Sequence, residues 1–133
     1  MVEINAYSKA ADGGKKLSAN FTVKEFACKD GSDAVLTAPR LVMVLQSIRS
    51  HFAAPVVIHS AYRTPQYNAK VGGAAHSQHC YGTAADISVK GQTPASVAAY
   101  ARQLMPDWGG VGVYAGQGFT HVDVRETRSD WTG

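Results

Sequence analysis

Two stretches of the chain repeat apolar residues at the spacing of an amphipathic helix. The first opens at Thr37-Ala38-Pro39, where a hydroxyl that can cap a helix precedes a proline suited to the first turn. It runs to about His51, and its apolar stripe consists of Leu41, Val44, Leu45, Ile48 and Phe52. The second opens at Thr93-Pro94 and ends at Pro106. The pattern therefore predicts two main helices, each with one side facing a core.

Other stretches alternate apolar and polar residues with the period of a β-strand. Between Thr83 and Val89 every second side chain is apolar, so a strand here buries one side and carries Asp86 on the other. We expect a short helix over Pro65–Lys70, and strands over residues 55–60, 83–89, 109–114 and 119–124, the last two as a hairpin-like pair. The order of these elements predicts an α+β fold, with two main helices packed on a small, mostly antiparallel sheet.

The first twenty residues lack such a pattern. They are polar, with Gly13-Gly14-Lys15-Lys16 in the middle, and we expect a loose N-terminal arm with one edge strand. Residues 21–26 alternate briefly, which favours either a strand or an extended docking segment. At 133 residues the chain is long enough to bury one core. The sequence thus predicts an arm over residues 1–20 and a single domain over residues 21–133.

Two short stretches concentrate residues that bind metals. The first, residues 76–86, holds two imidazoles, a thiol and one carboxylate. Within it, His79 precedes Gly82, where a turn can direct the imidazole toward the face that carries Asp86. A second predicted strand carries His121 on its polar face. His79, Asp86 and His121 would form a two-histidine, one-aspartate set that leaves a fourth position to water, as catalytic zinc sites do.

Three further residues are candidates for a metal ligand or a disulfide: Cys28, His76 and Cys80. Cys80 is a soft donor, but adjacent residues in an extended chain point apart, so we expect it beside the site rather than on the metal. Cys28 and Cys80 form either one disulfide or two reduced thiols, and we favour the thiols. We expect His76 at the rim, because a fourth protein ligand would take the position that water needs.

Three motifs follow one another along the chain, and together they are highly specific. They are Ser60-Ala61-Tyr62-Arg63-Thr64 with Tyr67-Asn68, then Ser77-x-His79-x-x-Gly82-x-Ala84-x-Asp86, then His121-Val122-Asp123. This combination resembles the D-alanyl-D-alanine carboxypeptidase/endopeptidase family of zinc peptidases, which share the Hedgehog/DD-peptidase fold and cut peptidoglycan peptides. The resemblance runs from about Phe21 to Trp131, and the closest likeness is to small cell-wall hydrolases of phages and prophages.

The resemblance implies roles for residues around the candidate ligands. It implies one zinc ion per chain, held by the two histidines and the aspartate. It also implies that Arg63 faces the active site and holds the substrate's carbonyl or carboxylate, a role that suits a planar fork of donors. Gln78 and Ser77 flank the first ligand, where relatives often place a polar residue that serves the substrate or supports the metal ligands. For these two residues, a role outside the site stays equally open.

Asp123 has two possible roles. Many relatives place an acidic residue three positions before the last histidine, but this chain has Gly118 there, and residues 115–120 contain no acid. Asp123 is the nearest carboxylate and shares a strand face with His121, so we expect it to act as the general base for the metal-bound water. The alternative is that Asp123 accepts a hydrogen bond from an imidazole and orients it.

These observations favour a zinc-dependent peptidase that hydrolyses amide bonds in peptidoglycan stem or cross-bridge peptides. We expect an endopeptidase rather than a D,D-carboxypeptidase, because the loop between Tyr114 and Phe119 is too short to wall off the chain beyond a terminal residue. The alternative is a catalytically inactive module that keeps zinc and binds the cell wall, or a structural piece of a phage. The missing acid at Gly118 keeps that alternative open.

The net charge and the composition limit which binding partners we expect. A net charge of +3 and a pI near 9.0 suit an anionic polymer such as a cell wall. No basic cluster with interleaved aromatic residues is present, so we expect no nucleic-acid partner. We find no signal peptide in the first thirty residues and no run of transmembrane length, so we expect no membrane insertion. If the chain is complete, it is made in the cytoplasm and reaches the wall by a route other than a signal peptide, such as phage- or prophage-type release. We expect the protein to be a monomer.

Overall fold

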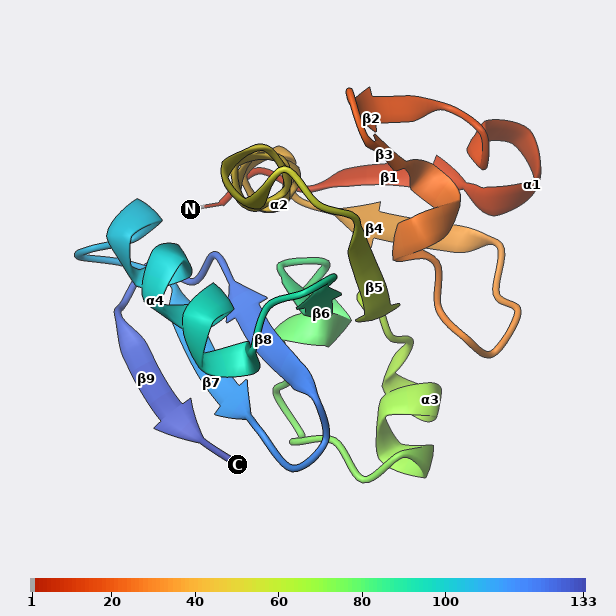
Figure 1. The fold of residues 1–133 in the computed structure, drawn as a ribbon. Helices are drawn as coiled ribbons and strands as arrows, with labels where there is room; N and C mark the ends of the chain where they lie inside the picture. The colour runs from red at the N-terminus through yellow and green to blue at the C-terminus, as the bar shows by residue number, and fades with distance from the viewer. Residues whose placement is uncertain (1) are drawn as a thin grey trace.

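A five-stranded sheet forms the centre of the protein, whose structure is a computed structural model that describes residues 2–133 (Figure 1). The strand order is β5-β6-β8-β7-β9, and every neighbouring pair is antiparallel except β7 and β9. The strands are β5 (Val56–Ser60), β6 (Ala84–Val89), β7 (Gly110–Tyr114), β8 (Phe119–Asp123) and β9 (Ser129–Thr132). The predicted α+β class with a mostly antiparallel sheet is confirmed.

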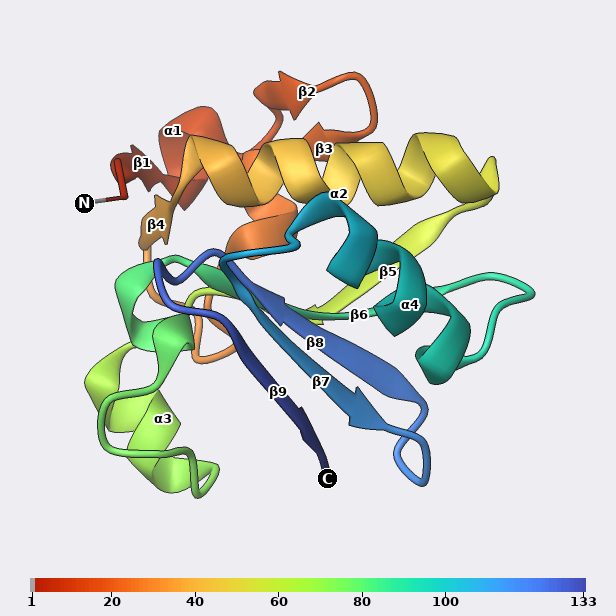
Figure 2. The same ribbon diagram turned by 90° about the vertical axis from the view of Figure 1, so that its left-hand side faces the viewer.

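Helices α2 (Pro39–Phe52) and α4 (Pro94–Leu104) pack on this sheet, as the turned view in Figure 2 shows. Helix α4 begins after Thr93 as predicted, and the Thr93 hydroxyl caps it by accepting a hydrogen bond from the Ser96 amide at 3.1 Å. The predicted capping role of Thr37 is wrong. Thr37 is the last residue of strand β4, and Ala38 occupies the cap position of α2 without a side-chain hydrogen bond.

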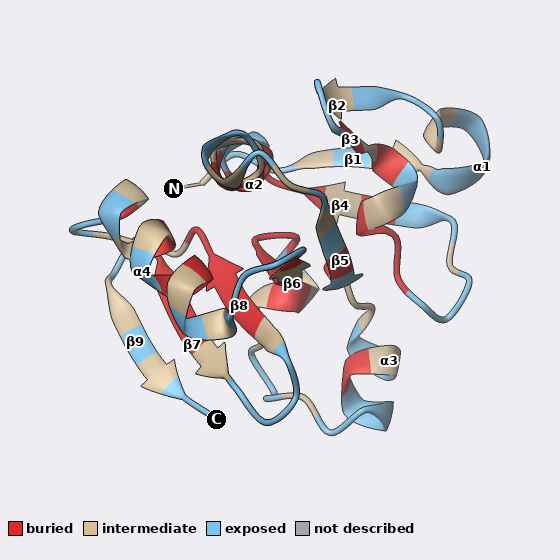
Figure 3. Cartoon of the chain, in the orientation of Figure 1, coloured by how far each residue is buried: buried red, intermediate tan, exposed pale blue. Residues whose placement is uncertain are grey.

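Alternation along β6 and β8 gives the sheet two different faces. Ala85, Ile87 and Val122 are fully buried and form part of the core with the apolar sides of the two helices. Figure 3 shows buried residues along β6 and β8. Because successive side chains of a strand point to opposite faces, Asp86 and His121 point away from these helices. The sheet therefore separates the apolar core from the polar residues that the sequence singles out.

The N-terminal segment has more regular structure than predicted. Strand β1 (Asn5–Ser8) pairs with β4 (Ala34–Thr37), a single helical turn α1 (Lys9–Asp12) follows β1, and β2 (Lys16–Ser18) pairs with β3 (Phe21–Thr22). The expected loose arm with one edge strand is thus corrected to two paired strands and a helical turn, while Met1 lies outside the described residues. Main-chain pairing holds these strands, and they are too short and polar to show a period in the sequence. The boundary after residue 20 stays a prediction.

Residues 21–26 are neither a full strand nor an extended segment. After β3 the chain forms a 3-10 helix, η1 (Val23–Phe26), which buries Val23 and Phe26 in the core. A capping box starts it: the Glu25 carboxylate accepts a hydrogen bond from the Thr22 amide at 2.9 Å. The brief alternation that favoured a strand is therefore one short strand followed by a turn that places two apolar residues in the core.

Two short helical elements and two free cysteines complete the described fold. Helix α3 (Pro65–Lys70) is present as predicted, and a short 3-10 helix, η2 (Gln78–Tyr81), precedes β6. Cys28 and Cys80 are free thiols, the first buried and the second half-buried. Within residues 2–133, no helix combines the length and apolar character that crossing a bilayer requires.

Candidate metal centre

The candidate ligands come from two neighbouring strands and the turn before them. Asp86 of β6 and His121 of β8 lie directly opposite each other in the antiparallel pair. His79 lies in η2, which Ser77 starts by accepting a hydrogen bond from the His79 amide at 3.2 Å. Gly82 ends η2 at φ +76, and a Cβ there would meet the Leu36 carbonyl oxygen at 2.6 Å. Glycine at this position therefore lets the turn deliver His79 beside the strand.

Three donor atoms converge on the polar face of the sheet. The distance from His79 Nε2 to Asp86 Oδ2 is 3.3 Å, and that from His121 Nδ1 to Asp86 Oδ1 is 3.0 Å. One donor atom from each of the three residues lies within 4.8 Å of the others, and all three residues are buried. Two imidazoles and a carboxylate at this separation can hold a metal ion, and this donor set is one that zinc uses.

The second nitrogen of each imidazole has its own partner. His79 Nδ1 lies 2.7 Å from the Ala61 carbonyl oxygen, so this nitrogen carries the proton and Nε2 keeps a lone pair for a metal. His121 Nε2 lies 2.8 Å from Asp123 Oδ2, which leaves Nδ1 as the nitrogen on the side of Asp86. Each ring is thus held through one nitrogen and turns its other nitrogen toward the Asp86 carboxylate, where a metal ion would bind between them.

The charges of the centre are strongly coupled. Burial raises the pKa of Asp86, but the hydrogen bonds with His121 and His79 outweigh it and hold that pKa below its ordinary value. Burial lowers the pKa of His121, while its hydrogen bonds with Asp123 and Asp86 raise it, and the net direction is upward. The Asp86 carboxylate is therefore ionised at neutral pH, in the form that binds a cation.

Asp123 lies behind the His121 ring and is fully buried. Its carboxylate accepts hydrogen bonds from Arg125 Nε at 2.8 Å, from Arg125 Nη2 at 2.7 Å and from the Arg125 amide at 3.1 Å, besides the contact with His121. Burial raises the pKa of Asp123, but the bonds with Arg125 and His121 hold it below its ordinary value. Gly110 leaves room for this cluster, because a Cβ there would meet Asp123 Oδ2 at 2.3 Å.

Arg63, Gln78 and Ser77 line the cavity above the three donors, which has a volume of about 540 Å³. The Arg63 guanidinium lies 3.5 Å from Asp86 Oδ2, and its Nε donates to Ser60 Oγ at 3.1 Å. The Gln78 side-chain oxygen accepts a hydrogen bond from Thr83 at 2.8 Å. The structure thus brings these three predicted residues to the cavity with the candidate ligands, whereas Asp123 does not line it.

Aromatic residues at the cavity were not predicted. The Trp131 ring lies 5.0 Å from the His121 ring, and its Nε1 donates to the Tyr114 hydroxyl at 2.8 Å. Arg125 also lies over the indole, 5.2 Å from its centroid. Tyr114, Phe119 and Trp131 all line the cavity. The signal in the sequence was Gly112, where a Cβ would meet the indole at 2.5 Å, but the glycine does not say which side chain approaches it.

The model of the peptidase M15 family matches residues 17–123. The chain belongs to this family. The matched segment includes all three candidate ligands and ends at Asp123, so β9 and its tryptophan lie beyond it. A search of curated proteins found no match. Membership of the peptidase M15 family and the convergent donors together support a metallopeptidase.

Proposed function

We propose that this M15 peptidase is zinc-dependent and hydrolyses amide bonds in peptidoglycan stem or cross-bridge peptides. One observation carries the proposal: His79, Asp86 and His121 converge on a cavity, with one nitrogen of each imidazole turned toward Asp86 and the other held by a separate acceptor. One zinc ion per chain at these donors would polarise the scissile carbonyl and supply a water that ionises near neutral pH. The place of action we propose is the bacterial cell wall.

Arg63 would position the substrate in this mechanism. Its side chain is 17 % exposed, and it lies on the wall of the cavity beside Asp86. Ser60 and Asn68 accept hydrogen bonds from two of its nitrogens, which fixes the plane of the fork. The remaining donors can bind the oxygen that becomes negative during hydrolysis, or a substrate carboxylate. Gln78 and Ser77 would contact the peptide at the same wall.

We propose that Asp123 orients His121 rather than takes a proton from water. Three hydrogen bonds from Arg125 and one contact with His121 occupy its oxygens, and it has no exposed surface. A carboxylate with a lowered pKa is also a weaker base. These contacts support the orienting role that the sequence left open, and they weigh against the base role.

A second candidate function has an observation in its favour. Among the described residues, Asp86 is the one carboxylate that lines the cavity, so no free acid faces the position of a metal-bound water. This supports the alternative of a zinc-containing module that binds the cell wall without cutting it. Incubation with purified peptidoglycan separates the two: the peptidase releases new amino groups, and the binding module sediments with the wall and releases none.

We further propose that the enzyme is an endopeptidase and works as a monomer. The turn from Tyr114 to Phe119 has exposed residues at its tip, and Gly116 and Gly118 have open space around them. Such a turn offers no wall beyond a terminal residue. The enzyme should therefore cleave cross-linked wall fragments at internal bonds, as mass analysis of the products would show. Release of terminal D-alanine from free pentapeptide stems, with cross-links left whole, would contradict the endopeptidase proposal.

A further inference from the structure

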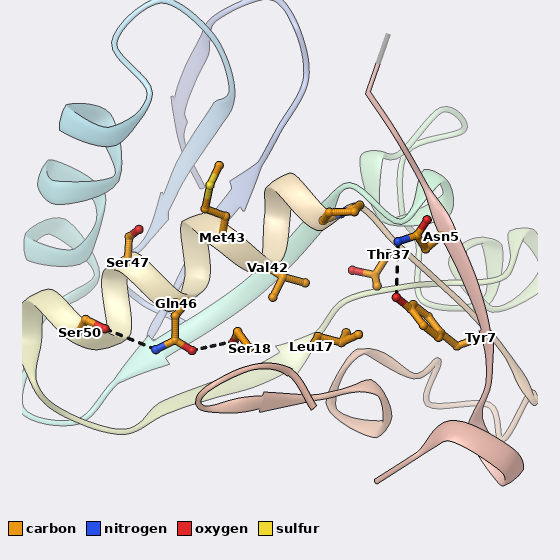
Figure 4. Close-up of a pocket in the computed structure, with 11 residues that line it drawn as sticks. Asn5, Tyr7, Leu17, Ser18, Thr37, Val42, Met43, Gln46, Ser47 and Ser50 are labelled. Atoms are coloured by element: carbon orange, nitrogen blue, oxygen red, sulfur yellow. Dashed lines mark hydrogen bonds between the residues drawn. The ribbon is translucent and has the colours of Figure 1, made fainter. Parts of the chain in front are cut away.

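A second cavity of about 540 Å³ lies between helix α2 and the N-terminal strands β1 and β2 (Figure 4). We name it the α2 groove; it is lined by residues of β1, β2 and α2 and by Thr37 of β4, and it shares no residue with the cavity of the metal centre. Met43 and Ser47 line it from a different side of α2 than Leu41 and Leu45, which lie in the core. Helix α2 and the sheet therefore separate the groove from the metal centre.

The lining of the α2 groove is uncharged. It contains no aspartate, glutamate, lysine, arginine or histidine among the described residues. Hydroxyl and amide groups alternate with apolar side chains such as Leu17 and Met43, and Met43 is 60 % exposed. An ionic ligand would lose its hydration here without a counter-charge. A neutral ligand with both hydrogen-bonding groups and apolar faces fits the lining.

Several polar groups of the α2 groove have unused hydrogen-bonding capacity. The Thr37 hydroxyl is buried and has no partner among residues 2–133, and Figure 4 shows it turned toward α2. Asn5 Nδ2 and the Tyr7 hydroxyl are 3.5 Å apart, at the outer limit of a hydrogen bond. By contrast, Gln46 is fully engaged, with bonds of 2.6 Å to Ser18 and 2.8 Å to Asn20. Gln46 thus holds the wall in place, and the other groups stay available.

The unpartnered Thr37 hydroxyl points most directly to a ligand. A buried hydroxyl without a partner destabilises the free protein, and it is rare in folded chains. Rotation about the Cα–Cβ bond exchanges the positions of the hydroxyl and the methyl group at little cost in volume. A ligand in the groove can therefore gain a hydrogen bond that the free protein lacks.

We propose that the α2 groove binds an N-acetylated sugar of a glycan strand. Such a sugar is neutral, its hydroxyls and amide can pair with Asn5, Tyr7 and Thr37, and its acetamido methyl can contact Leu17 and Met43. The volume of the groove falls within the roughly 300–1,000 Å³ that small-molecule sites span. The choice of this sugar among neutral ligands rests on the proposed function, because peptidoglycan strands consist of N-acetylated sugars. The groove would hold the protein on the polymer and raise the local concentration of peptides at the metal centre.

A titration followed by amide chemical shifts tests this proposal. The zinc-free protein is titrated with tri-N-acetylchitotriose, and in parallel with cellotriose, which lacks the acetamido groups. We expect shifts confined to β1, β2, β4 and α2 for the first sugar, and at least tenfold weaker binding for the second. Shifts at the metal cleft alone, equal binding of the two sugars, or no shifts at millimolar sugar would overturn the proposal.

Two variants with matched controls locate the binding. Ser47→Arg fills the groove from the helix and should abolish binding, whereas Ser96→Arg, the same change on α4, should not. Thr37→Val removes the buried hydroxyl and should weaken binding on the order of fivefold, the scale of one hydrogen bond. Thr127→Val, at an exposed threonine outside the groove, should change nothing. Wild-type binding by both Ser47→Arg and Thr37→Val would overturn the site.

The sugar titration tests the groove and the wall digestion tests the peptidase, so either proposal can be rejected while the other stands. Sugar binding without release of amino groups from peptidoglycan would keep the groove and reject the peptidase. Cleavage of peptidoglycan without shifts in the groove would keep the peptidase and reject the groove.

The Thr37→Val variant removes an unpaired polar atom, so its melting temperature should equal or exceed that of the wild type. A loss of sugar binding in this variant is then not a loss of fold.

Discussion

At the scale of single residues, the two histidines of the metal centre depend on different acceptors. His79 is held by the main-chain carbonyl of Ala61, which no substitution removes. His121 is held by the carboxylate of Asp123, which a single substitution changes. The ring of His121 should therefore be the more sensitive of the two to changes outside the ligand set.

The role of Asp123 can be read from zinc affinity and turnover together. If Asp123 orients His121, Asp123→Asn should weaken zinc binding by roughly 10–100-fold, because an amide is a poorer acceptor for the imidazole. Competition with a chromophoric chelator measures this. The control is Asp130→Asn, which alters an exposed aspartate paired with Arg102 and Arg128 and should keep wild-type affinity. Wild-type zinc affinity in Asp123→Asn with turnover down on the order of 10²-fold would restore the base role.

The ligand assignment predicts which histidines carry the metal. His79→Ala and His121→Ala should each lose stoichiometric zinc, whereas His59→Ala should keep it, because His59 is exposed and bonds Ser88. Metal analysis after dialysis gives the answer. Zinc binding should also weaken as pH falls, since protons compete for the imidazoles, and the loss should begin above the ordinary histidine pKa of about 6.5 because the pKa of His121 is raised. One zinc per chain in both ligand variants would show that the assignment is wrong.

At the scale of secondary-structure elements, the spacing of apolar residues predicted the helices and strands that bury one side. Helices α2 and α4 and strands β6 and β8 each bury one side, and the resulting alternation is visible in the sequence. Strands β1, β2 and β9 are short, polar and held by main-chain pairing, so they leave no period to detect. The same limit applies to the site. The three candidate donors were found from their residue types, whereas Trp131 beside His121 lies on β9, which the pattern did not predict.

Gly112 should be essential for the position of β9. A Cβ there would meet the Trp131 indole at 2.5 Å, so Gly112→Ala should displace the tryptophan and destabilise the protein by about 1–3 kcal/mol. Denaturant unfolding measures the change. Gly116→Ala is the matched control, because nothing lies within 4 Å of its added Cβ, and its effect should stay within about 0.5 kcal/mol. Equal stability of the two variants would mean that β9 does not pack as described.

At the scale of the whole molecule, the sheet divides the protein by chemistry. Its helix-covered face supplies the core, and its other face carries the candidate ligands and the cavity above them. The contacts of Asp123 join β8 to Arg125 and hold the ring of His121, a candidate ligand, which is the basis of the orienting role proposed for it. The sequence could place Asp123 beside His121, but it could not reveal that Arg125 occupies the carboxylate, because that contact depends on side-chain rotamers.

We propose that zinc at His79, Asp86 and His121 makes this chain a peptidase. The most direct test titrates zinc into the metal-free protein while cleavage of purified peptidoglycan is followed by the release of amino groups. Cleavage should rise linearly and reach its plateau at one zinc per chain, and His79→Ala should stay inactive at that ratio. Full cleavage by the metal-free protein, or no cleavage at one bound zinc per chain, would show that zinc at these residues does not make the chain a peptidase.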